Sequence, residues 1–332
     1  MPFIKVKTSS GEVKFFYTIS TPTSTNAKTI DKKIPTVLFL HSVYIAQEVF
    51  ELQWEDPRIR RFNCVAVDMR EHGYTTGSKV PQGYGQRDAA NDVALVMDAL
   101  KIPAYHIVAQ SMGTIVALAL AVYHPKKVLS MFLVSPLALK ETADVLEGRE
   151  EIAEYWKQGF PDGNPDITTL QDAVYGAMQF GFSNRMDGLS HALVARTYPI
   201  IVKTCSPKHF DIYDRMMGDF SNNRREYAPS ELAKISGPVQ LVHGGADIVY
   251  PLERAQTFLR CLQNAGVDVT LSQIPDAPHW ACTYMSTAFK MNDMMSGFLE
   301  RACKSGAPPI PEQVTSPWEG DLLKAGWEKE DD

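Results

Sequence analysis

One serine of this chain has neighbours that suit a nucleophile. Ser111 stands in the sequence Ala-Gln-Ser-Met-Gly at residues 109–113, between an apolar run at residues 105–108 and an Ala- and Leu-rich helical pattern at residues 114–122. A serine on a sharp strand-to-helix turn exposes its hydroxyl, and small neighbours let the strand and the helix approach each other. Serine is also favoured as a helix N-cap. The five residues alone leave both interpretations open, so the partners of the hydroxyl must decide.

Two later residues have the types that would activate this hydroxyl. A serine needs a base to accept its proton and a third group, usually a carboxylate, to orient that base. The candidate base is His279, in a proline-rich loop after the last apolar run, and the candidate acid is Asp247, in a loop with two glycines after the preceding run. Asp276 is a rival acid, but only three residues from His279 it suits a turn better. We therefore predict a triad of Ser111, His279 and Asp247.

Acyl transfer also needs hydrogen-bond donors aimed at the developing oxyanion, and backbone N–H groups are fixed in place before reaction. Met112, just after the serine at a helix N-terminus, is expected to supply one donor. The second is expected from the turn that follows the first apolar run, with the Val43 N–H as first choice and Ser42 next. His41, in the same turn, is expected to bond loop backbone rather than to transfer a proton.

Uninterrupted apolar runs predict the elements that position these residues. Such runs are typical of parallel strands covered on both faces, and they occur at residues 36–40, 63–67, 105–108, 129–134, 239–242 and 267–271. Helical patterns lie between them, for example at residues 88–100 and 252–265, and residues 11–19 alternate as a strand of an initial pair. The alternation predicts an α/β fold with a mostly parallel central sheet and helices on both faces.

One long segment interrupts this rhythm. Residues 139–234 contain no apolar strand but several helical patterns rich in Met, Tyr and Phe, and we expect them to form a helical lid inserted into a core of residues 1–138 and 235–302, followed by a C-terminal tail at residues 303–332. Pro161, Pro165, Pro199 and Pro207 are expected to separate the lid helices. The sequence leaves open whether the tail packs on the surface or is partly disordered.

The lid composition suits an adaptable apolar pocket. Candidate pocket residues are Tyr44, Met178, Phe182 and Trp280. Most Met and aromatic residues of the lid are equally consistent with a core of the lid itself, so the pocket assignment rests on their types alone.

The composition of the chain restricts the kinds of molecule that it could bind. A net charge of −6 without a basic stripe argues against nucleic acid and acidic membrane surfaces. The first residues carry charges where a signal peptide has its apolar core, and no run reaches the roughly 18 residues of a membrane span, so we expect a cytoplasmic protein. Five scattered cysteines without a C-x-x-C pair indicate reduced thiols and no zinc site. We expect a small-molecule substrate and no metal or organic cofactor, while the oligomeric state stays open.

With these residues in place, the chain resembles the α/β-hydrolase superfamily over residues 36–301, in particular its lidded esterase, lactonase and C–C hydrolase branch. The resemblance rests on the turn at His41, the elbow around Ser111, Asp247 and His279 in that chain order, and the segment Asp-Met-Arg-Glu-His-Gly-Tyr-Thr at residues 68–75. The resemblance implies structural roles for a further set of residues: Arg70, His72, Gly73, Asp88 and Asp92.

Two positions depart from the family pattern. Ser42 stands where the family has glycine, which would tighten the oxyanion turn or add a hydroxyl donor, and Ala109 replaces the first glycine of the elbow. Neither change removes a catalytic group. Serine rather than aspartate at position 111 argues against epoxide hydrolases and haloalkane dehalogenases, which the family resemblance would otherwise allow.

The residues and the resemblance together predict a serine hydrolase that acts on an ester, lactone or thioester of a small to medium, largely apolar molecule through an acyl-enzyme. An acyltransferase would use the same triad and pass the acyl group to an alcohol or amine. A slow-turnover ligand receptor on the same fold is the third alternative. The sequence does not decide between them, because all three keep the same residues.

Overall fold

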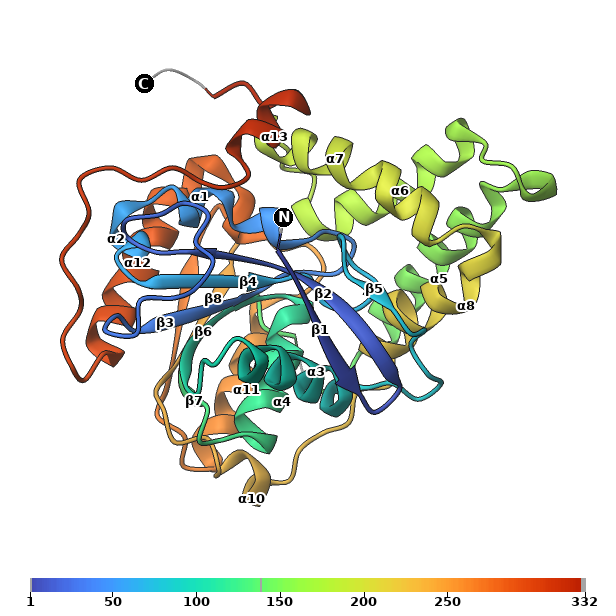
Figure 1. Ribbon diagram of the computed structural model, residues 1–332. Helices are drawn as coiled ribbons and strands as arrows, with labels where there is room; N and C mark the ends of the chain where they lie inside the picture. The colour runs from blue at the N-terminus through green and yellow to red at the C-terminus, as the bar shows by residue number, and fades with distance from the viewer. Residues whose placement is uncertain (1, 138, 330–332) are drawn as a thin grey trace.

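The computed structural model describes residues 2–137 and 139–329, which are built around one sheet (Figure 1). Its strands are β1 (Phe3–Thr8), β2 (Gly11–Ser20), β3 (Thr36–Leu40), β4 (Asn63–Val67), β5 (Thr76–Gly77), β6 (Tyr105–Gln110), β7 (Val128–Val134), β8 (Val239–Gly244) and β9 (Val269–Ile274). The order is β1-β2-β4-β3-β6-β7-β8-β9, with β5 paired to β2. All neighbours from β4 to β9 are parallel, whereas β1, β2 and β5 pair antiparallel. The predicted α/β fold is confirmed.

The central parallel strands are buried because helices cover both faces, whereas the edge strand β9 is only partly buried. Every residue of β3, β4, β6 and β8 is buried, as the continuous apolar runs predict. The covering helices are α1 (Glu51–Trp54), α2 (Pro57–Arg60) and α12 (Met285–Ala302) on one face, and α3 (Gln86–Ala99), α4 (Met112–Tyr123) and α11 (Leu252–Asn264) on the other (Figure 1). No helix among the described residues is both long enough and apolar enough to cross a membrane.

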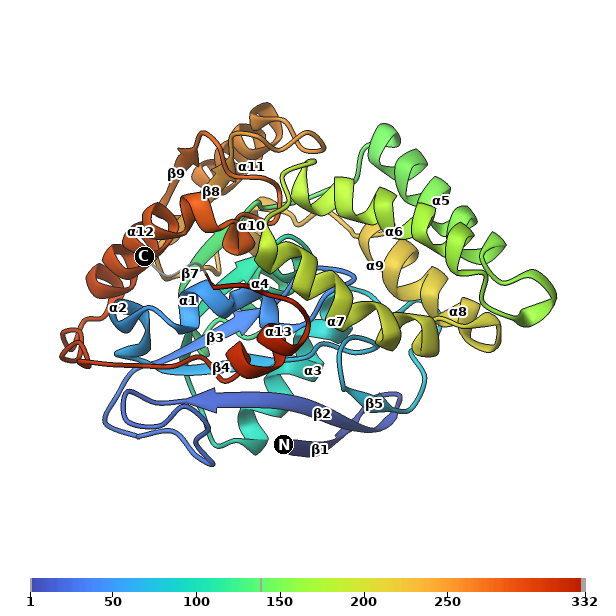
Figure 2. The same cartoon turned by 90° about the horizontal axis from the view of Figure 1, so that it is seen from above.

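A group of helices is inserted between β7 and β8 and lies to one side of the sheet (Figures 1 and 2). It comprises α5 (Ala143–Gln158), α6 (Ile167–Phe182), α7 (Gly188–Thr204), α8 (Phe210–Tyr213), a π-helix (Asp214–Asp219) and α9 (Phe220–Asn222). The last helix of the inserted segment, α10 (Pro229–Leu232), lies apart from this group and contacts α11 (Figure 1). No strand occurs among the described residues from 139 to 234, as the sequence predicts. The insertion therefore has a helical core of its own beside the sheet.

The expected helix break at Pro199 is wrong, because α7 continues through it. A proline inside a helix removes the hydrogen bond to the carbonyl four residues earlier, here that of Ala195. Ala195 and Pro199 are both exposed. Water can satisfy the freed carbonyl there, so the helix tolerates the proline.

The segment at residues 68–75 forms a buried structural turn, as the resemblance implies. Arg70 donates to the Ser10 hydroxyl at 2.7 Å and lies 3.5 Å from the carboxylate of Asp92. His72 bonds the Arg70 carbonyl at 2.9 Å. Gly73 has a φ of +53°, and a Cβ at this residue would lie 2.0 Å from the Asp68 carboxylate. These residues fix the loop between β4 and β5 and do not reach the triad.

Two helix contacts complete this scaffold. The Asp88 carboxylate accepts a hydrogen bond from the Gly85 N–H at 3.1 Å and so caps the start of α3. Asp92, one turn later, accepts from the Tyr84 hydroxyl at 3.0 Å. The expected capping and packing roles of both aspartates are confirmed.

The tail packs against both the core and the insertion over its described residues. Trp318 lies against Trp54 with ring centroids 4.5 Å apart, and Asp321 in α13 (Glu319–Lys324) pairs with Arg196 of α7 at 3.2 Å. The Ser316 hydroxyl donates to the buried carboxyl of Glu51. The packing alternative for the tail is therefore correct up to residue 329, and residues 330–332 lie outside the described part of the chain.

Candidate active site

The elbow between β6 and α4 places Ser111 in a strained backbone conformation. Its φ is +51° and its ψ −118°, a region that non-glycine residues rarely adopt and that costs on the order of 1–3 kcal/mol. Gly113 allows the close approach that this turn needs, because a Cβ there would lie 2.2 Å from the Leu40 carbonyl oxygen. Ser111 occupies the N-cap position of α4, yet its side chain makes no capping hydrogen bond. The hydroxyl is free for another partner.

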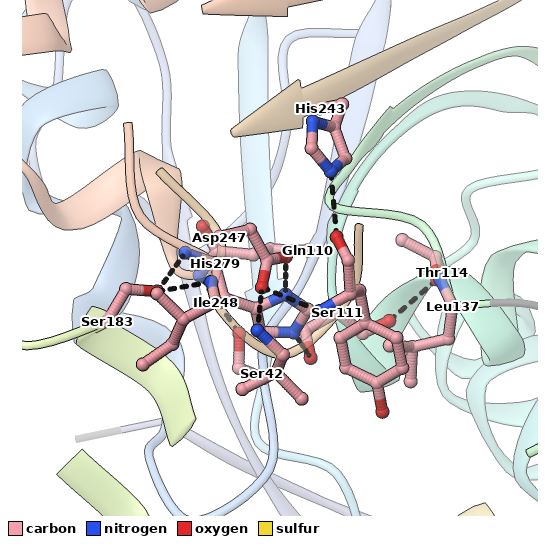
Figure 3. Close-up of polar contacts among 12 residues, drawn as sticks. Ser42, Gln110, Ser111, Thr114, Leu137, Ser183, His243, Asp247, Ile248 and His279 are labelled. Carbon is pink, nitrogen blue, oxygen red and sulfur yellow. Dashed lines mark hydrogen bonds and ion pairs between the residues drawn. The ribbon is translucent and has the colours of Figure 1, made fainter. Parts of the chain in front are cut away.

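That partner is His279 (Figure 3). The Ser111 Oγ lies 2.8 Å from His279 Nε2, and His279 Nδ1 lies 2.6 Å from Asp247 Oδ2. The three side chains come from the loops after β6, β8 and β9, whose carboxyl ends meet at one edge because the strands are parallel. Asp276, the rival acid, is exposed to solvent, whereas the side chain of Asp247 is fully buried against the histidine.

The environment of Asp247 keeps it ionised. Burial alone would raise its pKa, but the charge and hydrogen bond of His279, together with the N–H groups of Tyr250 and Val249, outweigh burial and hold the pKa below its ordinary value. Both N–H groups lie 2.9 Å from Oδ1. An ionised Asp247 accepts only, so His279 Nδ1 carries the proton and Nε2 accepts from the serine hydroxyl.

Two glycines bring the acid and histidine loops together. A Cβ at Gly244 would lie 2.3 Å from the Pro278 carbonyl oxygen, and one at Gly245 would lie 2.4 Å from the Pro275 carbonyl oxygen. The Ala246 N–H also donates to the Ala277 carbonyl at 3.0 Å. The glycine pair, which the sequence offers only as a loop signal, is what permits the 2.6 Å contact between Asp247 and His279.

The turn after β3, which carries the predicted donor Val43, is held by the ring of His41. His41 Nε2 accepts from the Met69 N–H at 2.9 Å, so its Nδ1–H donates to the Ser42 carbonyl at 2.7 Å. A trans peptide directs its C=O and N–H in opposite directions, so this bond turns the Val43 N–H away from the ring. Within residues 2–137 and 139–329, neither the Val43 N–H nor the Met112 N–H has a protein acceptor. Their role as oxyanion donors stays a prediction.

His41 has the structural role expected of it. Burial, and secondarily the charge of His72, lowers the pKa of His41 to about 3, while its bond to Ser42 opposes the shift. The ring is therefore neutral at ordinary pH and bonded at both nitrogens to backbone. It orients the oxyanion turn and has no free nitrogen with which to transfer a proton.

Ser42, the departure from the family glycine, uses its hydroxyl as an acceptor. The Gln110 Nε2 donates to Ser42 Oγ at 2.9 Å (Figure 3). Gln110 Oε1 accepts from the Cys282 N–H at 2.7 Å. Sequence reasoning missed Gln110, although it directly precedes the nucleophile. An amide at that position is the only signal in the sequence, and its partners come from remote loops.

Aromatic rings enclose the histidine, and the sequence analysis did not anticipate them. Tyr250 stacks on His279 with centroids 4.9 Å apart and planes at 29°, and Phe180 of α6 meets it edge-on at 5.8 Å. Both rings are buried. Tyr250 could have been flagged by its place three residues after Asp247, whereas nothing in the sequence brings Phe180 here.

The end of α6 also contacts the backbone of the triad loops. The Gly181 carbonyl accepts from the Trp280 N–H at 2.7 Å. The Ser183 hydroxyl oxygen lies 3.4 Å from both the His279 N–H and the Ile248 N–H (Figure 3). The insertion therefore bonds directly to the loops that carry the acid and the base.

An apolar pocket adjoins this site. Its walls come from α5, α6, α7, the oxyanion turn and the histidine loop, and they include three of the four candidate pocket residues: Tyr44, Met178 and Trp280. Phe182 does not line it. Its ring meets the Trp280 ring edge-on at 4.9 Å and is fully buried. Phe182 therefore supports the pocket wall from behind, because the last turn of α6 directs it toward the core.

The nucleophile is closed off in this conformation. Ser111 and His279 are both 0% exposed. The apolar pocket reaches Trp280, the residue after His279, but neither Ser111 nor His279 lines it. A substrate can meet the serine only after side chains or helices at this boundary move.

The chain belongs to the α/β-hydrolase fold family, whose model matches residues 35–284. One relative is the dihydrolipoyllysine-residue acetyltransferase component of the acetoin cleaving system from Cupriavidus necator, 28% identical over 78% of this chain; the chain spans 61% of that protein. Another is 3-oxoadipate enol-lactonase 1 from Acinetobacter baylyi, 25% identical over 63% of this chain and 72% of the relative.

The fold also matches solved structures. A thermophilic esterase from Thermogutta terrifontis superimposes with a TM-score of 0.66 at 16% sequence identity, covering 91% of this chain and 99% of the esterase. At that identity the likeness shows a shared fold and nothing about the substrate. A further relative is the monoacylglycerol lipase ABHD6 from Mus musculus, 25% identical over 71% of this chain and 68% of the relative.

Proposed function

We propose that the chain is a serine hydrolase that cleaves an ester, lactone or thioester of a small to medium, largely apolar molecule through an acyl-enzyme on Ser111. The observation that carries the proposal is the 2.8 Å contact between Ser111 Oγ and His279 Nε2, with the histidine in turn 2.6 Å from Asp247. The named activities of the relatives, an enol-lactonase and a monoacylglycerol lipase, are compatible with such a reaction.

The reaction follows from the hydrogen bonds. His279 Nε2 takes the proton of Ser111, whose Oγ attacks the substrate carbonyl, and the Met112 and Val43 N–H groups stabilise the oxyanion. Asp247 stabilises the imidazolium. When the intermediate collapses, His279 gives the proton to the departing oxygen or sulfur. Water then loses a proton to His279, attacks the acyl carbon, and releases the acid with the serine hydroxyl restored.

The pocket supports a largely apolar acyl or alcohol group. Its walls carry the side chains of Ile45, Ile152, Val174, Met178 and Ile201, and Trp280, the residue after His279, also lines it. Burying apolar surface there gives binding energy of about 25 cal/mol per Å². A charged group would lose its hydration without a partner on these walls.

We propose that residues 139–234 act as a lid. Because Ser111 is buried, the site must open before a substrate can bind. Helices α5, α6 and α7 line the apolar pocket beside the site, so movement of these helices would open it. Closure would exclude water from the oxyanion and strengthen its hydrogen bonds. Residues of this segment would therefore affect substrate choice more than the chemistry.

A covalent probe tests the assignment of the nucleophile. A fluorophosphonate should label the wild-type protein at Ser111 and fail on Ser111→Ala, while His279→Ala should label at least 100-fold more slowly, about the loss expected without a general base. Asp276→Asn is the matched control and should label normally, since Asp276 is exposed. Equal labelling of the same peptide in Ser111→Ala would overturn the proposal.

Acyl transfer is a second candidate, because one relative is named as an acetyltransferase component. The same acyl-enzyme would pass its acyl group to an alcohol, thiol or amine in place of water. The two functions separate by product: incubation with an acyl ester and a competing acceptor gives the free acid from a hydrolase and the acceptor's ester, thioester or amide from a transferase. A majority of acceptor product at millimolar acceptor would favour transfer.

A further inference from the structure

Gln110, the residue before the nucleophile, uses both ends of its side chain. Its Nε2 donates to Ser42 Oγ at 2.9 Å and its Oε1 accepts from the Cys282 N–H at 2.7 Å. Gln110, Ser42 and Cys282 are all completely buried. The amide therefore bridges the oxyanion turn after β3 and the loop three residues beyond His279.

One end of the bridge is the side chain of Ser42, whose peptide bond to Val43 carries the second proposed oxyanion donor. The Ser42 carbonyl is held by the His41 ring at 2.7 Å, and the Ser42 side chain is held by Gln110. The first bond holds the backbone of Ser42 and the second holds its side chain. The Ser42–Val43 peptide, and with it the Val43 N–H, then has little freedom to rotate.

We propose that Gln110 and Ser42 form a matched pair of positioning residues that holds the Val43 N–H in place for the oxyanion. The pair explains why serine can replace the glycine that the family resemblance leads one to expect at position 42, since its hydroxyl has a dedicated donor. This inference rests on the proposed function. Neither residue touches the substrate, and both act through the Val43 peptide.

The hydrogen bonds on the other side of the Cys282 peptide offer a control. The Cys282 carbonyl accepts from Gln53 Nε2 at 3.2 Å, and the same Nε2 lies 3.0 Å from Asn292 Oδ1. Asn292 in turn donates to the Leu52 carbonyl at 2.7 Å. Gln53 is thus a fully buried glutamine of the same polar network that bonds the Cys282 peptide but not the oxyanion turn.

The test compares Ser42→Ala, Gln110→Met, the double variant and Gln53→Met, each with a chromogenic apolar ester such as 4-nitrophenyl butyrate. Deleting an oxyanion donor costs about 10²–10³ in kcat, and displacing one should cost less. Each single variant should lose about tenfold in kcat with KM within about twofold, and the double variant should lose about the same tenfold. Gln53→Met should keep kcat within about twofold.

A transition-state analogue gives a second readout. A boronic acid that forms a tetrahedral adduct with Ser111 should bind the Ser42 and Gln110 variants more weakly by about the factor lost in kcat/KM, because both the adduct and the transition state need the donor. Melting temperatures identify variants that merely fail to fold, and the analogue is then measured on the folded fraction of the milder Ser42→Ala.

Three results would overturn the inference: losses that multiply to about a hundredfold in the double variant, losses in KM alone, or an equal loss in Gln53→Met. The proposed function fails separately. If Ser111→Ala retains hydrolysis, the nucleophile is wrong. If Ser111→Ala is inactive while Gln110→Met and Ser42→Ala have wild-type kcat, only the positioning pair is wrong.

Discussion

At the scale of single residues, the chemistry depends on which proton each group holds. Asp247 accepts the His279 Nδ1–H and two backbone N–H groups, so the His279 tautomer and the orientation of the ring are both fixed by one carboxylate. Ser111 occupies the N-cap position of α4 without making a capping hydrogen bond, and its hydroxyl bonds His279 instead. The ambiguity between a cap and a nucleophile is therefore resolved by a residue 168 positions away.

Replacing Asp247 by Asn should disable catalysis without unfolding the chain. An amide at this place keeps the shape but offers an N–H where a carboxylate accepts, which favours the wrong histidine tautomer. We expect kcat to fall by about 10⁴, with a circular dichroism spectrum like that of the wild type. Asp276→Asn should retain full kcat, and a comparable loss in that exposed variant would contradict the assignment of the acid.

At the scale of elements, α6 has two functions at once. Its middle residues line the apolar pocket, while Gly181 and Ser183 at its end bond the backbone of the triad loops. A Cβ at Gly181 would lie 2.3 Å from the Trp280 ring, so the helix can dock this closely only with glycine there. The same helix thus shapes the pocket and supports the histidine.

Filling the pocket from α6 should change substrate preference. Met178→Trp adds bulk to the wall, so we expect kcat/KM for a long-chain ester to fall by about tenfold or more relative to a short-chain ester. Tyr175→Ala, on the exposed side of the same helix, is the control and should leave the ratio unchanged. Steady-state kinetics with esters of two and eight acyl carbons measures it, and an unchanged ratio in Met178→Trp would place the acyl group elsewhere.

The tail should contribute to stability through one aromatic contact. Trp318 is buried against Trp54, while α13 pairs with α7 through Asp321 and Arg196. Trp318→Ala should lower the free energy of unfolding by about 3–5 kcal/mol. Urea denaturation measures this loss, and Leu323→Ala on the exposed side of α13 should cost less than about 0.5 kcal/mol. Equal effects of the two changes would show that the tail is not anchored by Trp318.

At the scale of the whole molecule, burial makes the pKa values of some side chains differ between the folded and the unfolded chain. The shift is downward for one group and upward for another. Burial lowers the pKa of His106 to about 4. Burial raises the pKa of Glu51 to about 8, with the Ser316 hydroxyl opposing and the nearby Glu55 and Glu319 adding to the shift. The two groups therefore make opposite contributions to the pH dependence of stability, and each is best measured against its own neutral variant.

The histidine contribution should be lost on acidification. Between pH 6.5 and about 4 the unfolded chain binds a proton at His106 that the folded chain does not, so the wild type loses stability relative to His106→Gln as pH falls. The difference should change by at most about 1.4 kcal/mol per pH unit. Urea denaturation of both proteins at pH 7, 5.5 and 4.5 measures it. A constant difference would show that His106 titrates normally in the folded state.

The glutamate contribution should have the opposite sign. Between pH 4.5 and about 8 the folded chain keeps a proton on Glu51 that the unfolded chain releases, so the wild type loses stability relative to Glu51→Gln as pH rises. Glutamine preserves an acceptor for the Ser316 hydroxyl. The same denaturation series extended to pH 8 tests this, and a wild type that keeps or gains stability relative to Glu51→Gln as pH rises would contradict a protonated, buried Glu51.

The sequence by itself determined the sheet and the set of catalytic candidates. Continuous apolar runs mark strands that are covered on both faces, and the serine, acid and base each follow such a run. Parallel strands place their carboxyl ends at one edge, so three residues remote in sequence had to converge. This reasoning needs only local patterns and the geometry of a parallel sheet.

The tertiary structure alone decided how the converging loops bond and what covers them. The Gln110 bridge joins Ser42 to Cys282, and Phe180 reaches His279 from the insertion. Phe182 packs behind the pocket, and α7 passes through Pro199 because that side faces solvent. These outcomes depend on the side to which each segment turns after it docks. Local residue patterns do not encode that orientation, because it is set by packing against distant parts of the chain.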